Sequence, residues 1–266
     1  MALGDALVDL QDLTRRLRRD CPWDREQTAR TIVPHTVEEA YEVADAALAG
    51  SPAKLLDELG DLLFQVYFLA LLLEEQGYGG LEDVARNVQE KLVRRHPHVF
   101  GGGEADSAGA VRLRWEAIKT EQEGREGIFH DVPGSLPGLL HARKVQRRAA
   151  AVGYDWPDVA GPLAKIREEL GELEDVVAAA GAPAPETEPR EDAVGEIGDL
   201  LFTVVNVARR LNVDPELALR ATSARFVERV ELAERLAAKA GETWTELDLE
   251  AQDAYYDRAK AELASR

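Results

Sequence analysis

Apolar residues recur along most of the chain at the three- and four-residue spacing of amphipathic helices. Runs of β-branched residues are few, and no turn signal joins two alternating segments into a hairpin. The pattern therefore predicts an all-α protein. The expected helices span 4–19, 36–49, 53–76, 81–95, 108–122, 137–151, 158–179, 191–211, 215–239 and 246–263.

Two helix starts carry a clear local signal. Ser51-Pro52 and Asp214-Pro215 each place a capping side chain before a proline at the first helical position. The helix that starts at Ser51 contains the longest uncharged apolar run, LLFQVYFLALLL at 62–73. This run is shorter than the ~20 residues that a membrane-spanning helix needs, so we expect it to lie in a bundle core or a subunit interface.

The chain carries one acidic pattern twice on the same apolar background. TVEEAYEVADA at 36–46 and DELGDLLFQVYFLA at 57–70 are followed, later in the chain, by KIREELGELED at 165–175 and GEIGDLLFTVVNVA at 195–208. Both copies read EExxE, a spacer, and ExxD before Leu-Leu-Phe. The acids are Glu38, Glu39, Glu42, Glu58 and Asp61 in the first copy, and Glu168, Glu169, Glu172, Glu196 and Asp199 in the second.

The spacing of these acids predicts metal sites. Residues three and four apart share one face of a helix, so two such helices packed together would bring four or five carboxylates into one place. Clustered carboxylates at a packed surface repel one another unless a cation neutralises them, and oxygen ligands favour a hard metal such as Mg²⁺. A solvated acidic face or a capping box formed by Thr36 and Glu39 would explain the first EExxE alone, but neither explains the repeat.

Basic residues at helical spacing follow each acidic copy. Lys91 and Arg95 follow the first, and Arg225 and Arg229 follow the second. An i, i+4 pair of cations can bind phosphate oxygens, and it can equally balance charge on a helix surface.

The repeat favours two domains of similar architecture, which we expect at 1–125 and 126–266. A Pro-, Ala- and Glu-rich insertion at 180–191 lengthens the second copy, so that Glu172 and Glu196 lie 24 positions apart where Glu42 and Glu58 lie 16 apart. Loop-closure cost grows slowly with length, so both copies can form equivalent sites.

Composition narrows the function further. A formal charge of -18 argues against binding to nucleic-acid polymers, which need Lys and Arg to displace counterions. The single cysteine, Cys21, excludes an internal disulfide framework and fits a reducing compartment. The first residues lack the layout of a secretory signal, and no segment is long and apolar enough to be a membrane anchor. We therefore expect a cytoplasmic protein.

Several segments together resemble the MazG-type nucleoside triphosphate pyrophosphohydrolases, in their tandem-domain bacterial form. Besides the two acidic copies, these are CPWDREQT at 21–28, KLVRRHPHVF at 91–100, RWEAIKTEQE at 114–123 and VGYDW at 152–156. The resemblance covers nearly the whole chain. It implies an all-α bundle that dimerises to form its sites and hydrolyses NTPs and dNTPs to monophosphates and pyrophosphate with Mg²⁺, Mn²⁺ being an alternative.

The resemblance also assigns roles to residues of both copies. The implied metal ligands are Glu39, Glu42, Glu58 and Asp61 in the first copy and Glu169, Glu172, Glu196 and Asp199 in the second. Glu38 and Glu168 would orient or deprotonate the attacking water. The implied phosphate ligands are Lys91 and Arg95, or Arg225 and Arg229, and further nucleotide contacts fall on Lys144, Asp155, Trp156 and Asn206.

By resemblance the second copy is the better supported catalytic domain, while the first copy is also complete in its acids and its activity stays open. It has Asn206 where the first copy has Phe68, although Gly195 stands where the family often has another acid and Arg225 replaces a lysine. With this many acids, two or more metal ions per site are expected. Two other classes of protein also place acidic side chains together on helices. One is a di-iron carboxylate bundle, which needs an ExxH motif that the chain lacks, and the other is a non-catalytic helical adaptor with acidic faces.

Overall fold

The computed structural model describes residues 2–101, 127–130, 132–180 and 190–265. In these ranges every regular element is helical, so the all-α prediction is confirmed. Internal contacts divide the chain into two compact units, Met1–Lys119 and Thr120–Arg266. The expected helix at 108–122 and most of the expected insertion at 180–191 lie outside the described residues, and the MazG-like character of each domain stays a prediction.

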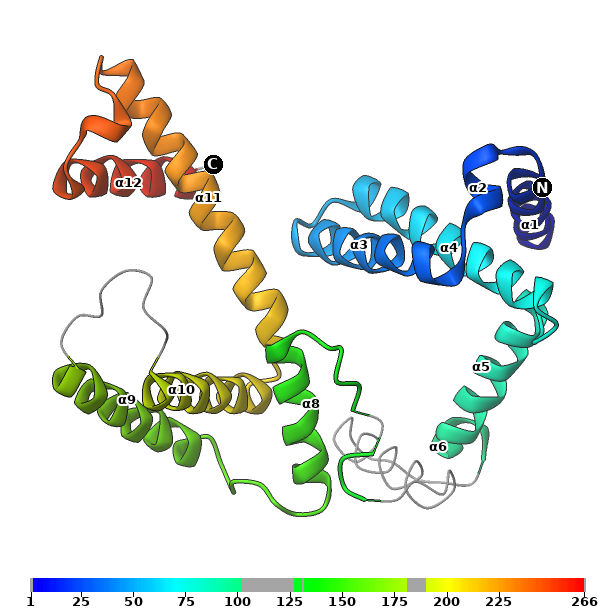
Figure 1. The fold of residues 1–266 in the computed structure, drawn as a ribbon, viewed down its shortest axis with the longest axis horizontal. Helices are drawn as coiled ribbons and strands as arrows, with labels where there is room; N and C mark the ends of the chain where they lie inside the picture. The colour runs from blue at the N-terminus through cyan, green and yellow to red at the C-terminus, as the bar shows by residue number, and fades with distance from the viewer. Residues whose placement is uncertain (1, 102–126, 131, 181–189, 266) are drawn as a thin grey trace. The chain divides into compact units, whose positions relative to one another are not determined.

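The first unit contains a pair of long helices framed by shorter ones. Its elements are α1 (Leu3–Asp20), α2 (Pro22–Glu26), α3 (Ala29–Leu48), α4 (Pro52–Glu75), α5 (Leu81–Arg95) and α6 (Pro97–Phe100). Figure 1 shows α3 and α4 lying side by side, joined by a tight turn. In that turn Gly50 adopts a φ of +64°, a conformation that glycine accepts without steric cost.

The start of α3 corrects the expected helix at 36–49. Thr28 caps the helix instead, because its Oγ1 accepts from Thr31 N–H at 3.3 Å while Thr31 Oγ1 accepts from Thr28 N–H at 2.9 Å. Thr36 lies inside the helix and its hydroxyl donates to Ile32 O at 3.3 Å. The capping box of Thr36 and Glu39, an alternative explanation for the first EExxE, is therefore not formed, and the reciprocal cap of Thr28 and Thr31 lets the helix begin before Pro34.

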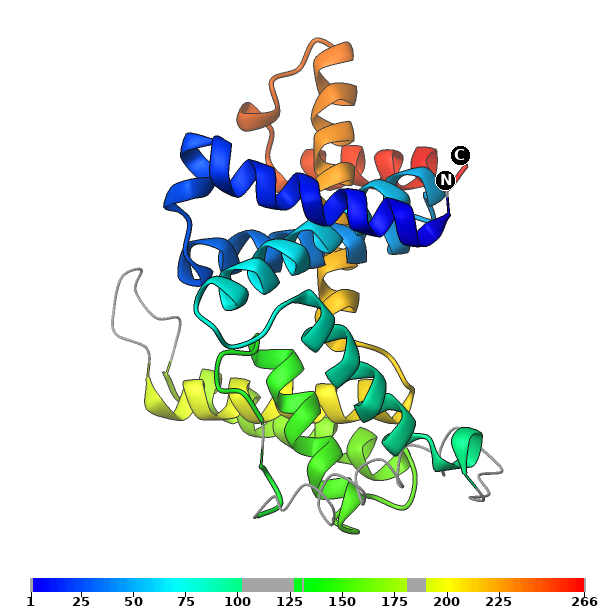
Figure 2. The ribbon, with the colours of Figure 1, turned by 90° about the vertical axis from the view of Figure 1, so that its right-hand side faces the viewer.

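The core of the first unit lies between α3 and α4. Ile32, Phe68 and Leu72 are buried together, with Phe64 and Leu69 packed against them. Figure 2 shows α1 lying across α4. Two bridges hold it there: Arg18 Nη2 lies 2.8 Å from Glu75 Oε2, and Arg15 Nη2 lies 3.0 Å from Glu74 Oε1.

The second unit repeats the helix pair. Its elements are α8 (Gly138–Ala151), α9 (Ala160–Ala180), α10 (Glu191–Arg210), α11 (Pro215–Lys239), the 3₁₀ turn η1 (Trp244–Glu246) and α12 (Leu249–Ala264). Helices α9 and α10 pack side by side as α3 and α4 do, and α8 packs against α10 (Figure 1). The Asp214-Pro215 start is confirmed, since Asp214 Oδ1 accepts from Glu216 N–H and Leu217 N–H, both at 3.1 Å.

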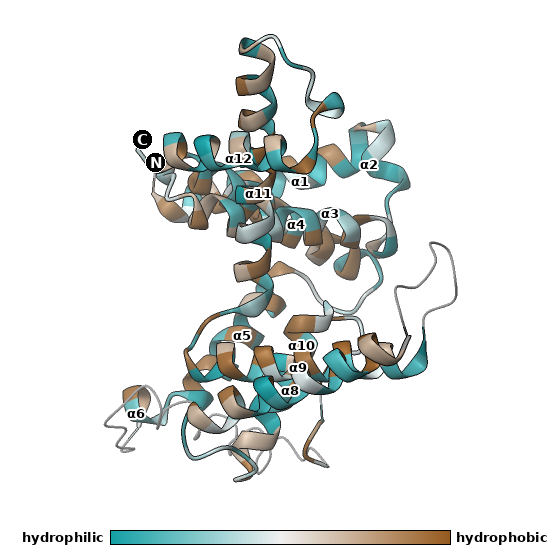
Figure 3. Ribbon diagram, turned by 90° about the vertical axis from the view of Figure 1, so that its left-hand side faces the viewer, coloured by the Kyte–Doolittle hydropathy of each residue, from teal (hydrophilic) through white to brown (hydrophobic). Residues whose placement is uncertain are grey.

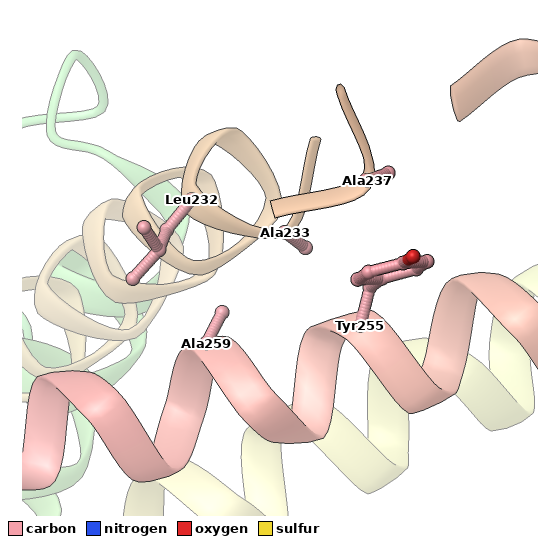
Figure 4. Packing of buried hydrophobic residues seen from close by; sticks show 5 residues of the cluster. All are labelled: Leu232, Ala233, Ala237, Tyr255 and Ala259. Atoms are coloured by element: carbon pink, nitrogen blue, oxygen red, sulfur yellow. The ribbon is translucent and has the colours of Figure 1, made fainter. Parts of the chain in front are cut away.

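Helices α11 and α12 share a second buried cluster. Leu232, Ala233 and Ala237 of α11 face Tyr255 and Ala259 of α12 (Figure 4). The three alanines are fully buried, so their small side chains allow the two helix backbones to approach closely.

Each long helix pair leaves one apolar face of its second helix open within its unit. Figure 3 shows hydrophobic residues interleaved with hydrophilic ones along these helices. The exposed apolar residues on α4 are Leu56, Leu59, Leu63 and Val66, and those on α10 are Val194, Ile197, Leu201 and Val204. In the part of the chain that the structure describes, none of the helices has the length and hydropathy to cross a membrane.

Candidate metal and nucleotide site

Three acids of each copy meet where the paired helices face each other. Glu39 of α3 meets Glu58 and Asp61 of α4, which we call the first cluster. Glu169 of α9 meets Glu196 and Asp199 of α10, which we call the second cluster. In each cluster one carboxylate oxygen per residue lies within 4.8 Å of the others. The helix spacing thus brings together the residue types that the repeat singled out.

The fourth acid of each copy lies beside its cluster. A hydrogen bond between Glu42 and Glu39 and one between Glu172 and Glu169 place both on the same face as the clusters. Their neighbours Glu38 and Glu168 point into solvent: Glu38 Oε2 lies 3.7 Å from His35 Nδ1, and Glu168 Oε1 lies 2.7 Å from Lys165 Nζ.

Crowding of the carboxylates perturbs their ionisation. Burial raises the pKa of Glu39, and the charge of Asp61 raises it further. In the second copy the hydrogen bond that the protonated form of Glu172 makes with Glu169 is the main cause that raises the pKa of Glu172, followed by burial. Each cluster is therefore an environment in which negative charge is in excess, and a cation would relieve it.

A lysine lies against each cluster, and the sequence analysis did not identify either. Lys54 Nζ is 3.7 Å from Glu58 Oε1, and Lys165 Nζ is 2.7 Å from Glu169 Oε1. Lys165 donates hydrogen bonds to Glu168 and to Glu169, and these bonds, the one to Glu168 first, raise the pKa of Lys165. Both lysines precede their acid by four residues, a helical spacing that could have revealed them.

The chemistry of the clusters fits a divalent cation. Every converging ligand atom is a carboxylate oxygen, which hard cations such as Mg²⁺ prefer. Glu39 Oε2 is buried and, among the described residues, has no hydrogen-bond partner. Buried polar atoms are normally satisfied, so this oxygen is available as a ligand. Glu169, which is 4% exposed, lies against Lys165 and Glu172.

The predicted phosphate ligands lie on other helices. Lys91 and Arg95 are on α5, and Arg225 and Arg229 are on α11. Arg225 Nη2 donates to Thr222 Oγ1 at 2.9 Å, and Arg229 Nη1 lies 3.5 Å from Tyr256 OH. Within the described ranges no ion pair joins these four cations to either cluster, so the structure of a single chain does not bring them to the acids.

A cavity of about 440 Å³ lies between α8 and α10, and we call it the α8–α10 pocket. Three predicted nucleotide contacts, Asp155, Trp156 and Asn206, line it, whereas Lys144 does not. The sequence analysis missed the other lining residues that matter below, which are Gln146, Phe202 and Arg209.

Arginines of α10 hold the loop that forms one wall of this pocket. Arg209 binds both carboxylate oxygens of Asp155, with Nη1 at 3.1 Å from Oδ2, and Arg210 Nη1 lies 3.1 Å from the same Oδ2. Burial is the largest single influence on the pKa of Asp155 and raises it, but the hydrogen bond and charge of Arg209, the Trp156 N–H and the charge of Arg210 together outweigh burial and lower that pKa. The loop is therefore fixed by charge, and Trp156 is fixed with it.

The first unit fills the corresponding place. Phe68 occupies in α4 the position that Asn206 occupies in α10, seven residues after the conserved aspartate of each copy. Phe68 is 1% exposed and packs with Ile32 and Leu72. The guanidinium of Arg18 lies 5.9 Å from the centre of its ring. The two copies thus share their acids but differ in the space beside them.

Fold and site define an all-α protein with two carboxylate clusters that could bind metal, one of them beside a pocket. The domain family described as MazG nucleotide pyrophosphohydrolase matches residues 27–100. The chain is 39% identical over 259 residues, 96% of both chains, to the nucleoside triphosphate pyrophosphohydrolase of Escherichia coli strain K12. It is 41% identical over 261 residues to the nucleoside triphosphate pyrophosphohydrolase/pyrophosphatase MazG of Thermotoga maritima, covering 97% of this chain and 96% of the relative.

A shorter match links the chain to the nucleoside triphosphate pyrophosphohydrolase of Mycobacterium tuberculosis, 38% identical over 152 residues that make up 56% of this chain and 46% of the relative. The two full-length matches establish the assignment. The chain belongs to the MazG family of nucleoside triphosphate pyrophosphohydrolases, and it is a hydrolase.

Proposed function

We propose that this chain hydrolyses NTPs and dNTPs to the monophosphates and pyrophosphate, with Mg²⁺, at the second cluster. The observation that carries the proposal is that the cluster and the α8–α10 pocket share one face of α10. Asp199, Phe202, Asn206 and Arg209 follow one another at intervals of three and four residues. A nucleotide needs these two environments side by side, since its phosphates are anionic and its base is flat and largely apolar.

The metal ligands of the proposed active site are Glu169, Glu172, Glu196 and Asp199. Two or more Mg²⁺ ions, with Mn²⁺ as an alternative, would neutralise the triphosphate and lower the pKa of a bound water. The protein contributes the positions of the ligands. Helix packing fixes Glu169 in a buried site, while Asp199 and Glu196 lie three residues apart on the facing helix.

Other side chains of the second unit would orient the reactants. Lys165 holds Glu168 at 2.7 Å beside the cluster, and there Glu168 would orient or deprotonate the attacking water. Arg225 and Arg229 would bind phosphate oxygens that extend beyond the carboxylates. Attack at the α-phosphorus is the direct route to a monophosphate and pyrophosphate.

We assign turnover to the second copy because, in the part of the first copy that the structure describes, a buried side chain fills the matching place. Its own acids, Glu39, Glu42, Glu58 and Asp61, would still bind a metal, with Glu38 beside them and Lys91 and Arg95 as the matching basic pair. Phe68 occupies the position of Asn206, so the nucleoside would have no equivalent wall to bind against.

We also propose a homodimer that acts in the cytoplasm. The exposed apolar residues of α4 and α10 recur at intervals of three, four and three residues, so each set forms one stripe along its helix. Contiguous apolar surface of this kind marks an interaction site. The single cysteine fits a reducing compartment.

The deciding experiment separates the two clusters. We expect Glu169→Gln and Asp199→Asn to lower kcat/KM for pyrophosphate release by at least about 10²-fold, because each removes a carboxylate that would hold the metal against the reacting phosphates. The matched first-copy changes, Glu39→Gln and Asp61→Asn, should leave most turnover. Pyrophosphate and orthophosphate are measured separately over a panel of NTPs and dNTPs, with and without Mg²⁺, and circular dichroism checks that each variant stays helical.

Two results would contradict the proposal in different ways. Full turnover in both second-copy variants would move the active site elsewhere. No Mg²⁺-dependent pyrophosphate release from any nucleotide would favour a non-catalytic acidic adaptor instead.

A further inference from the structure

Gln146, which lines the α8–α10 pocket, has an unused hydrogen-bond acceptor. The residue lies on α8, is 5% exposed and lines the cavity. Its Nε2 donates to Phe202 O at 2.7 Å, and since a carbonyl can only accept, this contact fixes the orientation of the amide. Gln146 Oε1 is then buried with no partner among the described residues. A buried acceptor left unpaired is costly, so the pocket favours a ligand that brings an N–H donor.

Asn206 offers the complementary group. Its Oδ1 accepts from Arg209 Nη2 at 2.8 Å, and because a guanidinium can only donate, this contact leaves the Asn206 NH₂ free to donate. Arg209 is itself held by both carboxylate oxygens of Asp155. The pocket is therefore lined by one oriented acceptor group and one oriented donor group, together with the aromatic side chains of Trp156 and Phe202.

We propose that this pocket reads the hydrogen-bonding edge of a nucleobase, with Gln146 Oε1 accepting from a base N–H and Asn206 Nδ2 donating to a ring nitrogen or carbonyl. The inference rests on the proposed function and adds how the site would select among nucleobases. Common bases carry a donor next to an acceptor on their Watson–Crick edge, so the pocket accepts many of them, with stacking on the aromatic walls. A base that lacks the donor leaves Gln146 unsatisfied and binds more weakly.

The test compares two monophosphates that differ in the donor alone. Purine riboside 5′-monophosphate lacks the 6-amino group of AMP but keeps its ring nitrogens. Isothermal titration calorimetry on the full chain should give a dissociation constant about 10-fold higher for the purine analogue, the scale of one buried unpaired acceptor. In Gln146→Met the two ligands should bind equally, because AMP loses its advantage. Asn206→Leu should weaken both ligands alike and keep the ratio.

Gln65→Met is the matched control. Gln65 is also a buried glutamine whose Oε1 has no partner among the described residues, but it lies on α4 and does not line this pocket, so its removal should leave the 10-fold ratio in place.

The inference is overturned if wild-type protein binds the two ligands equally or binds neither, or if folded Gln146→Met keeps the ratio. Should Gln146→Met fail to fold, equal weakening of both ligands by Asn206→Leu supports the inference, and unchanged binding overturns it. A chain that discriminates the ligands but releases no pyrophosphate would contradict the proposed function and leave this inference standing.

Discussion

Asp155 fastens the segment between α8 and α9 to the end of α10. Besides its bonds to Arg209 and Arg210, its Oδ1 accepts from Trp156 N–H at 2.9 Å. The indole of Trp156 then lies against Gly161 at the start of α9, where a Cβ would come within 2.2 Å of Trp156 Cε3. A single carboxylate thus sets the position of an aromatic wall of the pocket, and only glycine leaves room for it.

We expect Asp155→Asn to lower the free energy of unfolding at pH 7 by about 1–3 kcal/mol, the range for hydrogen bonds to charged groups. The pKa of Asp155 is lowered in the folded chain, so its stabilisation is present above the unfolded pKa near 3.8 and is lost as pH falls through the folded value. Urea unfolding of the wild type and of Asp155→Asn between pH 7 and 3 should show that their difference in free energy of unfolding disappears only at the acid end.

The exposed Asp9 on α1 provides the control for this prediction. Asp9→Asn should change stability by less than about 0.5 kcal/mol at every pH, as surface substitutions usually do. A gap between wild type and Asp155→Asn that is constant with pH would show that charge is not what holds the segment.

At the scale of elements, local signals predicted helices well and tertiary contacts poorly. Ser51 and Asp214 cap the helices that their Pro-containing signals predict, and the acid spacing correctly places Glu58 with Asp61 on a common face. The contact of Gln146 with Phe202 joins residues 56 positions apart on α8 and α10. Helical periodicity records which face a residue occupies but carries no information about its partner, so this half of the pocket could not be predicted.

The close approach of α11 and α12 is a property of their small residues. We expect Ala233→Leu to lower the free energy of unfolding of the second unit by about 1–3 kcal/mol, because the larger side chain overpacks a site that is fully buried. Ala224→Leu on the exposed side of the same helix should have little effect. Urea unfolding followed by circular dichroism measures both, and equal midpoints would show that the α11–α12 contact is loosely packed.

Over the whole molecule, the two copies align at a constant sequence offset along α4 and α10, the second helix of each pair. Glu58 and Asp61 precede Glu196 and Asp199 by 138 positions, and the exposed apolar residues of α4 precede those of α10 by the same number. The copies therefore share their carboxylates and their apolar stripe, and they differ at Phe68 and Asn206. One interior position thus separates a filled core in the first copy from a pocket in the second.

The shared stripe predicts how the chain assembles. We expect wild type to sediment at twice the mass of one chain, because burying leucine, isoleucine and valine side chains of both helices removes apolar surface from water at roughly 25 cal/mol per Å². Aspartates introduced together at Ile197 and Leu201 on α10, or at Leu59 and Leu63 on α4, should shift the protein towards the mass of one chain. Leu3→Asp, at an exposed apolar residue of α1 that belongs to neither stripe, should not. Sedimentation velocity across a concentration series measures the mass of each protein. A monomeric wild type would exclude the dimer. A shift caused by only one of the two pairs of substitutions would identify which copy forms the interface.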